Sequence, residues 1–204
     1  MKNILVSLKH RLEYLFFRNR KDKFVFEGKE YNYFYNLHNA TWNNERKIEI
    51  PIFVEYIKDT PTNDLLEVGN TLHYYMRRTR HTVLDKYEVM NGVINKDIVE
   101  FKPLRKFKKI ISISTIEHIG NEGAEEINPY KSIRAIDILI YLLEDNGTLL
   151  FSIPCGYHPK LDQCIKTMEN RKNIKISTIK TKPFGITNRS RIFKIKFVKI
   201  IKSV

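Results

Sequence analysis

The chain has 204 residues, of which 42% are hydrophobic and 29% are charged, and its formal net charge is +13 at pH 7. This size suits one domain with room for an N-terminal extension, and the hydrophobic fraction excludes a disordered chain. No apolar run reaches the roughly 18–20 residues of a membrane-spanning helix, so we expect no stable membrane insertion. The positive charge fits either an anionic partner, such as nucleic acid or an acidic glycan, or lysines spread over solvated surfaces.

Cysteine and histidine spacing argues against a metal site. Cys155 and Cys164 are the only cysteines, and no CxxC or Cys/His ligand spacing is present, so we expect no metal. Two thiols do not make a disulfide framework. The apolar start of the chain is interrupted by Lys9-His-Arg11, too early for a signal peptide. Together these features predict a cytoplasmic protein.

Residues 3–17 carry apolar side chains at helical spacing with basic residues between them, and the apolar positions are Leu5, Leu8, Leu12, Leu15 and Phe16. The pattern predicts an amphipathic helix. One interpretation packs this helix on the domain, and the other lays it on a membrane surface.

Aromatic and amide side chains crowd residues 31–46, ahead of a helix-like segment at 49–56. A lid over a ligand pocket would use Trp42 and Tyr35 for stacking and Arg46 for an acidic group. The alternative is an aromatic cluster that braces the N-terminal segment against the core, and the sequence leaves both open.

Asp59-Thr-Pro-Thr62 then breaks the chain. We therefore expect an N-terminal helical and aromatic extension at 1–58 and an α/β domain at 59–204.

The most informative stretch is 64–85. It reads as a buried strand at 65–68, a turn at Gly69-Asn70, a short helix, and a second strand that ends on Asp85. A glycine turn after one strand and an acid after the next form the general plan of a nucleoside-binding site. The three-glycine dinucleotide fingerprint is absent.

The rest of the chain alternates strands and helices. Only seven residues separate Asp85 from the strand-like Val93-Ile94, which is too short for a helical crossover, so this unit is either trimmed or paired differently. Further strands are predicted at 109–116, 148–153, 174–179 and 193–197, and helices are predicted to open at Asn128-Pro129 and at Pro159. The last two strands are expected to pair as a hairpin.

With these elements in place, the chain resembles a class I S-adenosylmethionine-dependent methyltransferase. The segments that carry the resemblance follow in the family's order: Leu65–Gly69, Val83–Asp85, Asn95–Ile98, Ile111–Ile119 and Gly147–Pro154. The resemblance implies a Rossmann-like α/β fold whose mostly parallel seven-stranded sheet ends in a C-terminal antiparallel hairpin. One departure is Asn70, which stands where a second glycine is usual.

The resemblance also implies S-adenosyl-L-methionine as the cofactor. Asp85 is expected at the ribose hydroxyls, and Asp97 with the backbone after it at the adenine. The residues expected to contact the cofactor are Glu67, Gly69, Asn70, Asp85, Lys86, Asp97, Ile98 and Ser114. From the residues alone, Glu67 lies within an apolar strand and is either a buried paired acid or a cofactor ligand.

For catalysis, methyl transfer depends mainly on positioning, and a hydroxyl acceptor also needs a base. His118 is the candidate base because it follows a strand at the ligand-binding edge of the sheet and histidine titrates near neutral pH. Glu117 is expected to orient His118 or to contact the cofactor's amino group. The alternatives are a structural hydrogen bond for His118 and a solvated loop position for Glu117.

The preferred function is therefore methylation of a small-molecule or glycan hydroxyl. An RNA-directed methyltransferase or RNA-binding protein is the second hypothesis, motivated by the charge and the aromatics. A non-catalytic module that keeps the fold is the third, motivated by the missing glycines. The oligomeric state is not predicted.

Overall fold

The structure is a computed structural model that describes residues 2–76, 80–121, 128–184 and 192–203, with side chains from residue 9 onward. The chain forms two compact units. The sheet unit comprises Ile57–Thr178 and Ile195–Val204. The aromatic unit comprises Met1–Tyr56 together with Ile179–Lys194, so a C-terminal segment joins the N-terminal residues.

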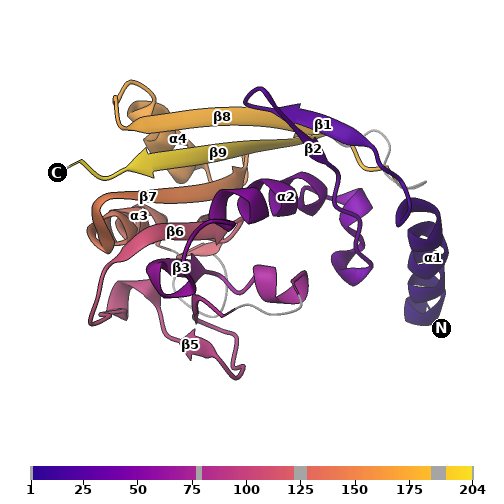
Figure 1. Ribbon diagram of the computed structural model, residues 1–204, viewed down its shortest axis with the longest axis horizontal. Helices are drawn as coiled ribbons and strands as arrows, with labels where there is room; N and C mark the ends of the chain where they lie inside the picture. Colours follow the sequence, from indigo (N-terminus) through magenta and orange to yellow (C-terminus); the bar gives the residue numbers. More distant parts are fainter. Residues whose placement is uncertain (1, 77–79, 122–127, 185–191, 204) are drawn as a thin grey trace. The chain divides into compact units, whose positions relative to one another are not determined.

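A seven-stranded sheet has the order β5-β4-β3-β6-β7-β9-β8 (Figure 1). Its strands are β3 (Leu65–Val68), β4 (Thr82–Asp85), β5 (Val93–Asn95), β6 (Phe107–Ile113), β7 (Leu143–Pro154), β8 (Ile174–Thr181) and β9 (Phe193–Ile201). The pairs from β5 through β7 are parallel, and β9 runs antiparallel to β7. This is a Rossmann-like α/β fold with a mostly parallel seven-stranded sheet, as predicted.

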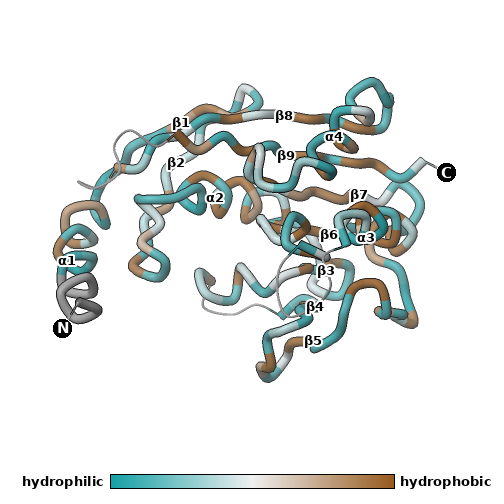
Figure 2. The backbone as a smooth tube through the Cα atoms, turned by 180° about the vertical axis from the view of Figure 1, so that it is seen from behind, coloured by the Kyte–Doolittle hydropathy of each residue, from teal (hydrophilic) through white to brown (hydrophobic). Residues whose placement is uncertain are grey.

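Two helices, α3 (Lys131–Tyr141) and α4 (Pro159–Met168), lie side by side on one face of the sheet (Figure 1). Their buried residues include Ile136 and Leu139 from α3 and Leu161 and Ile165 from α4. These residues share one hydrophobic core with residues of β6, β7 and β9, and Figure 2 shows the hydrophobic stretches of these strands in brown. Continuous apolar runs such as Leu149–Ile153 form strands here because a parallel sheet is buried on both faces.

The two helices begin at or close to their predicted starts. α3 begins at Lys131, shortly after Asn128-Pro129, and the Asn128 side chain accepts a hydrogen bond from the Tyr130 N–H at 3.1 Å. At α4, the His158 side chain caps the helix by accepting from the Leu161 N–H, also at 3.1 Å. His158 is therefore a buried structural residue.

The connections between β3, β4 and β5 are trimmed. A single 3-10 turn, η3 (Leu72–Tyr74), follows β3 where a short helix is predicted, and residues 77–79 lie outside the described part of the chain. β4 and β5 pair in parallel although only residues 86–92 join them. Of the two possibilities that the short spacing leaves open, the trimmed crossover is the one observed.

The aromatic unit contains α1 (Lys2–Phe17), a hairpin of β1 (Lys23–Phe26) and β2 (Lys29–Asn32), the 3-10 segment η1 (His38–Asn43) and most of α2 (Arg46–Ile57). Trp42 is fully buried, and its Nε1–H donates to Glu13 Oε2 at 3.0 Å. Phe17, Tyr14, Tyr35 and Phe184 pack around it. Trp42 therefore belongs to an aromatic cluster and presents no ring face to a ligand.

α1 packs through a different face from its apolar stripe. Glu13 and Phe17 are buried against Trp42, whereas Leu12, Leu15 and Phe16 are 62%, 53% and 68% exposed. The Glu13–Trp42 hydrogen bond and the stacking of Phe17 on Trp42 select this face. α1 therefore packs on the aromatic unit, while Leu12, Leu15 and Phe16 stay largely exposed. Within the described residues, no helix combines the length and the apolar character needed to cross a bilayer.

Candidate functional site

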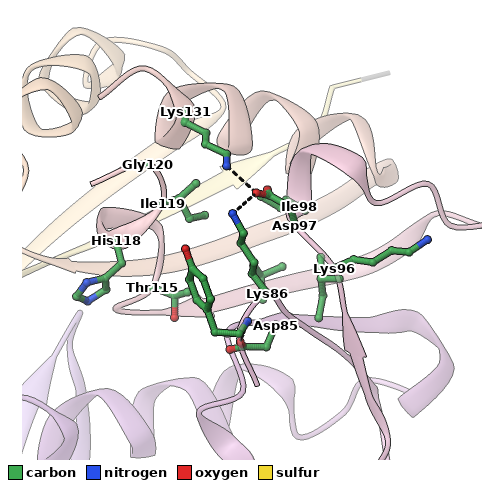
Figure 3. Close-up of a pocket in the computed structure, with 14 residues that line it drawn as sticks. Asp85, Lys86, Lys96, Asp97, Ile98, Thr115, His118, Ile119, Gly120 and Lys131 are labelled. Atoms are coloured by element: carbon green, nitrogen blue, oxygen red, sulfur yellow. Dashed lines mark hydrogen bonds and ion pairs between the residues drawn. The ribbon is translucent and has the colours of Figure 1, made fainter. Parts of the chain in front are cut away.

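A cavity of about 460 Å³ opens in the sheet unit where the parallel strands end (Figure 3). Polar groups from several elements line it, namely Gly69, Asp85, Lys86, Tyr87, Lys96, Asp97, Thr115, His118, Gly120 and Lys131. The apolar lining residues are Val68, Leu84, Ile98 and Ile119. A cavity of this size at the carboxyl edge of a parallel sheet is the usual place for a ligand in this architecture.

Gly69 lies in the turn after β3 and lines the cavity. Its φ is +86°, a conformation that side chains rarely adopt, and a Cβ there would lie 2.7 Å from Thr115 Cγ2. The turn therefore needs glycine for two reasons, the backbone conformation and the close approach of Thr115. Asn70 does not share this requirement, because its φ is not positive. The departure from glycine at position 70 is compatible with the turn.

Glu67 lies beneath this turn and does not line the cavity. Its side chain is fully buried: Oε1 accepts from the N–H groups of Thr71 and Leu72, at 2.9 and 2.8 Å, and Oε2 lies 2.7 Å from His81 Nε2. These protein groups account for the buried acid. Glu67 thus fixes the backbone of the turn from behind.

Asp85, at the end of β4, faces the cavity. Oδ2 accepts from the Asn70 N–H at 3.1 Å, and Oδ1 accepts from the Tyr87 and Glu88 N–H groups, both at 2.9 Å. A carboxylate has about four acceptor positions, so one remains on Oδ2. Asp85 both organises the loop after β4 and keeps an acceptor for a ligand hydroxyl.

Asn70 is buried beside the same turn. Its Nδ2 lies 3.9 Å from Met90 Sδ, and among the described residues its Oδ1 has no hydrogen-bond partner. A buried acceptor of this kind is costly unless a donor reaches it. Asn70 does not line the cavity, and its Oδ1 is enclosed by protein.

Asp97, after β5, is held between two lysines. Its Oδ2 lies 2.6 Å from Lys131 Nζ and 2.9 Å from Lys86 Nζ, and its Oδ1 accepts from the Val99 N–H (Figure 3). Burial alone would raise the pKa of Asp97, but these hydrogen bonds outweigh it and hold the pKa below its usual value. The same contact raises the pKa of Lys131. Ile98 follows as a buried wall of the cavity.

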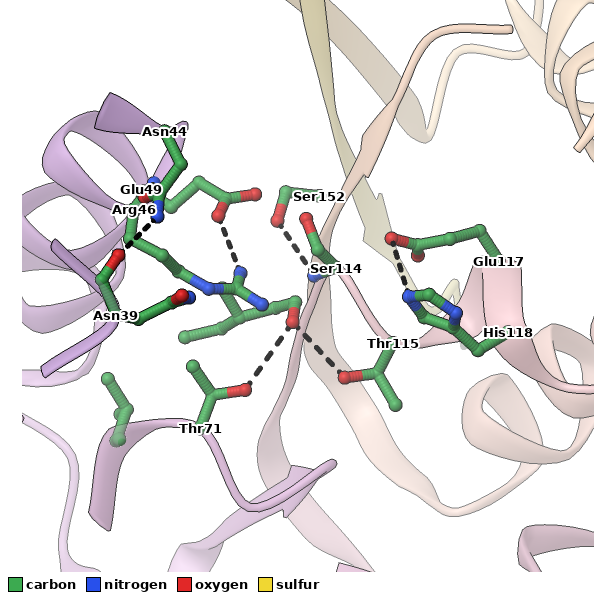
Figure 4. A network of polar contacts seen from close by, with 12 residues as sticks. Asn39, Asn44, Arg46, Glu49, Thr71, Ser114, Thr115, Glu117, His118 and Ser152 are labelled. Atoms are coloured by element: carbon green, nitrogen blue, oxygen red, sulfur yellow. Dashed lines mark hydrogen bonds and ion pairs between the residues drawn. The ribbon is translucent and has the colours of Figure 1, made fainter. Parts of the chain in front are cut away.

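His118 and Glu117 lie on the short turn η5 (Ile116–His118) after β6. His118 lines the cavity and is partly exposed, whereas Glu117 is 1% exposed and lies off the wall. Glu117 Oε1 is 3.7 Å from His118 Nε2 (Figure 4). On the other side of the ring, His118 Nδ1 is 3.4 Å from the Tyr157 hydroxyl. The imidazole thus lies between a carboxylate, beyond hydrogen-bond distance, and a phenol hydroxyl at the long end of that range.

Ser114 does not line the cavity. It is buried with φ +40°, and its N–H donates to the Ser152 carbonyl and hydroxyl oxygens (Figure 4). The next residue, Thr115, lines the cavity instead and donates to the Ile113 carbonyl oxygen at 3.1 Å. The strand-end position was predictable here, but not which of two adjacent hydroxyls faces the ligand.

Several cavity residues were not predicted from the sequence. Lys131 comes from the first turn of α3, 34 residues after Asp97 in the chain, and only the fold brings them together. Gly120, with φ +74°, lets the chain pass close to the Asn128 carbonyl. The sequence offered one signal that Gly120 lines the cavity, a glycine shortly after a strand end, but it offered no such signal for Lys131.

The lid candidate Arg46 and the possibility of a metal site remain to be placed. Arg46, proposed for a lid, forms a buried ion pair with Glu49 in the aromatic unit, with Nη1 and Oε2 at 2.6 Å (Figure 4). Among the described residues, no group of three His, Cys, Asp or Glu side chains is arranged to hold a metal ion.

Comparison with solved structures gives the same fold. The N-methyltransferase NodS from Bradyrhizobium japonicum WM9, in complex with S-adenosyl-L-homocysteine, superposes with a TM-score of 0.51 and 13% sequence identity over 78% of this chain and 87% of that one. A second structure of NodS from the same organism gives a TM-score of 0.50 and 11% identity, covering 78% of this chain and 97% of that one. No protein-family model and no curated protein matches the sequence. At this identity the likeness establishes the fold alone.

Proposed function

We propose that this protein is a methyltransferase that uses S-adenosyl-L-methionine to methylate a small-molecule or glycan hydroxyl. The observation that carries the proposal is Asp85, a carboxylate at the end of β4 that faces the cavity with an acceptor position left over. It lies beside a glycine turn in a fold shared with a methyltransferase solved with the demethylated cofactor.

The cavity residues fit the parts of this cofactor. Asp85 would accept from the ribose hydroxyls, while Asp97 and Ile98 would hold the adenine, the acid toward its amino group and the apolar side chain against the ring. Gly69 would admit the methionine part close to the backbone. Asn70 does not line the cavity and would act through its N–H, which donates to Asp85 and holds that carboxylate in place.

The remaining predicted contacts act less directly in this proposal. Glu67 holds the Thr71 and Leu72 amides in place, and Ser114 shapes the end of β6. Lys86 keeps Asp97 ionised and orients it.

When bound, the cofactor supplies a methyl group already activated on a sulfonium. His118 would take the proton from the acceptor hydroxyl at Nδ1, the ring nitrogen that does not face Glu117, as the acceptor oxygen is methylated. Glu117, behind Nε2, would stabilise the protonated ring, and the Tyr157 hydroxyl would hold the ring in place until the acceptor replaces it at Nδ1.

Native mass spectrometry of the purified protein tests the cofactor assignment. Added S-adenosyl-L-homocysteine should appear as a one-to-one complex. Absence of binding at millimolar ligand would favour the non-catalytic module over the enzyme.

Transfer of a labelled methyl group to a panel of hydroxyl acceptors tests the chemistry. With a competent acceptor, His118→Ala should lower kcat by about 10²–10⁴-fold while leaving cofactor affinity within about twofold. Asn121→Ala, on the same loop but not among the cavity residues, is the matched control. Wild-type kcat for His118→Ala would leave His118 structural.

RNA is the second candidate acceptor, favoured by exposed tyrosines at the cavity. Tyr87 lines the cavity and is 66% exposed, with Lys86 Nζ 5.3 Å from its ring centroid, and Tyr130 next to Lys131 is similarly exposed. Such rings stack on bases, and lysines attract phosphates.

Fluorescence anisotropy with a single-stranded RNA tests this candidate. Binding should weaken steeply as salt rises, and Tyr87→Ala should weaken it more than Tyr141→Ala, which removes an equally exposed tyrosine that does not line the cavity. Equal effects of the two substitutions, or binding insensitive to salt, would remove RNA as the acceptor.

A further inference from the structure

The outward face of α1 is apolar although the helix is already anchored. Leu12, Leu15 and Phe16 lie at spacings of three and four residues, so they share one helical face. Each is more than half exposed. Meanwhile Glu13 and Phe17, on another face, hold the helix to Trp42. The three exposed side chains are therefore not needed for the packing of the aromatic unit.

Basic residues are concentrated in the sequence on both sides of this apolar face. Within residues 9–23 the sequence carries six basic side chains, Lys9, Arg11, Arg18, Arg20, Lys21 and Lys23, against two acidic ones, Glu13 and Asp22. Neither acid opposes an anionic partner on this face: Glu13 is buried, and Asp22 accepts hydrogen bonds from Arg20 and Tyr35. The Arg20 guanidinium lies 5.6 Å from the Phe16 ring centroid, so positive charge directly adjoins the apolar face.

We propose that this face of α1 docks on an anionic phospholipid surface. Apolar side chains on one side of a helix, bordered by arginine and lysine, are the features of a helix that lies in the membrane interface. Leucine and phenylalanine would enter the acyl boundary while the cations contact lipid phosphates.

The same observations disfavour two other occupants. RNA offers phosphates, and a base would stack on Phe16, but Leu12 and Leu15 would stay in water because they have neither a ring to stack nor a polar group to pair. A second copy would bury the apolar residues but would bring the two sets of basic side chains together, and like charges repel. A lipid surface satisfies the apolar and the basic side chains at once.

Vesicle co-sedimentation with the full chain tests the proposal. We expect binding to phosphatidylcholine vesicles that contain phosphatidylserine and little binding to phosphatidylcholine alone. Leu15→Ser with Phe16→Ser should reduce binding by roughly tenfold or more, because both side chains leave the acyl boundary. Arg11→Gln with Arg18→Gln should reduce binding to the anionic vesicles and weaken its salt dependence.

The matched control replaces Leu104 and Tyr141 with serine, since both are highly exposed in the sheet unit. Emission from Trp42, the single tryptophan, reports whether the aromatic unit of each variant is folded. Wild-type binding by the correctly folded Leu15/Phe16 variant would overturn the proposal, as would equal loss in the control. A dimer in light scattering that the Leu15/Phe16 variant dissolves, with no vesicle binding by the wild type, would assign the face to a second copy and also overturn it.

Discussion

The aromatic unit and the sheet unit each bury an ionisable side chain, but they stabilise it differently. In the aromatic unit, Lys47 is fully buried and donates to the carbonyl oxygens of Asn44 and Lys182, at 3.2 and 2.7 Å. In the sheet unit, Glu67 receives two backbone N–H groups and lies against His81.

The two buried side chains also differ in their effect on the part of the structure around them. Burial lowers the pKa of Lys47 to about 8, although the nearby Glu45 opposes the shift. Lys47 therefore costs stability whenever it is charged. Glu67 has three partners and holds the turn that forms the cavity floor. We infer that the buried acid serves the site, whereas the buried lysine serves only the packing of its unit.

Removing the buried acid should have the largest effect. Glu67→Ala leaves His81 and two amide N–H groups buried without their acceptor, so we expect a loss of about 3–5 kcal/mol in the free energy of unfolding. Urea denaturation followed by far-UV circular dichroism measures it. Glu100→Ala, an exposed acid in the same unit, should change stability by less than about 0.5 kcal/mol. Similar losses in both variants would contradict the role given to Glu67.

Next in size is Gly69→Ala, for which the chain offers a close control. Gly69 and Gly92 share φ +86°, but a Cβ on Gly92 would meet nothing within 4 Å. Gly92→Ala should therefore cost only the left-handed conformation, about 1–2 kcal/mol. Gly69→Ala should cost about 1–3 kcal/mol more, because the Cβ displaces Thr115. Thermal unfolding of both variants measures the difference. Equal losses of stability would show that Thr115 moves aside at no measurable cost.

The buried lysine predicts a pH dependence in the aromatic unit. Between pH 8 and 10 the unfolded chain keeps the Lys47 proton, because its pKa is near 10.5, while the folded chain releases it. Unfolding then takes up a proton, so stability should rise with pH, by about 2 kcal/mol over this window. Urea denaturation followed by Trp42 emission measures it.

Lys47→Met should abolish this rise, and Lys29→Met, an exposed lysine of the same unit, should keep it. A rise that survives in Lys47→Met would assign the titration to another group.

The smallest expected effect is at Tyr157. Tyr157→Phe removes a hydroxyl 3.4 Å from His118 Nδ1, a long contact, so kcat should fall by only about threefold. The pH–rate profile should shift while KM for the cofactor stays unchanged. A fall in cofactor affinity with an unmoved profile would place Tyr157 in cofactor binding rather than in positioning His118.

The sheet unit was largely predictable because its strands are continuous apolar runs bounded by polar residues. The ends of those strands also gave Asp85, Asp97 and His118, which the fold brings to one cavity. The side chains that complete the site were not predictable. Lys131 reaches Asp97 from α3, and nothing in the local sequence indicates that contact.

The aromatic unit was less predictable. The β1–β2 hairpin has strands of only four residues, too short for a clear alternation, and its turn is Glu27-Gly28 with φ of +51° and +79°. Glycine is common in such turns, but glutamate at the first position is not a sequence signal for one. Phe184 joins Trp42 from the far end of the chain, a contact set by tertiary structure alone.

The central claim is that Asp85 binds the ribose of S-adenosyl-L-methionine. Isothermal titration calorimetry with S-adenosyl-L-homocysteine on the wild type, Asp85→Ala and Asp145→Ala tests it most directly, Asp145 being an exposed acid that does not line the cavity. We expect Asp85→Ala to lose roughly 10–100-fold in affinity, from a charged hydrogen bond of about 1.5–3 kcal/mol, with an unchanged circular dichroism spectrum. Asp145→Ala should bind as the wild type does. Wild-type affinity in a folded Asp85→Ala variant would contradict the account.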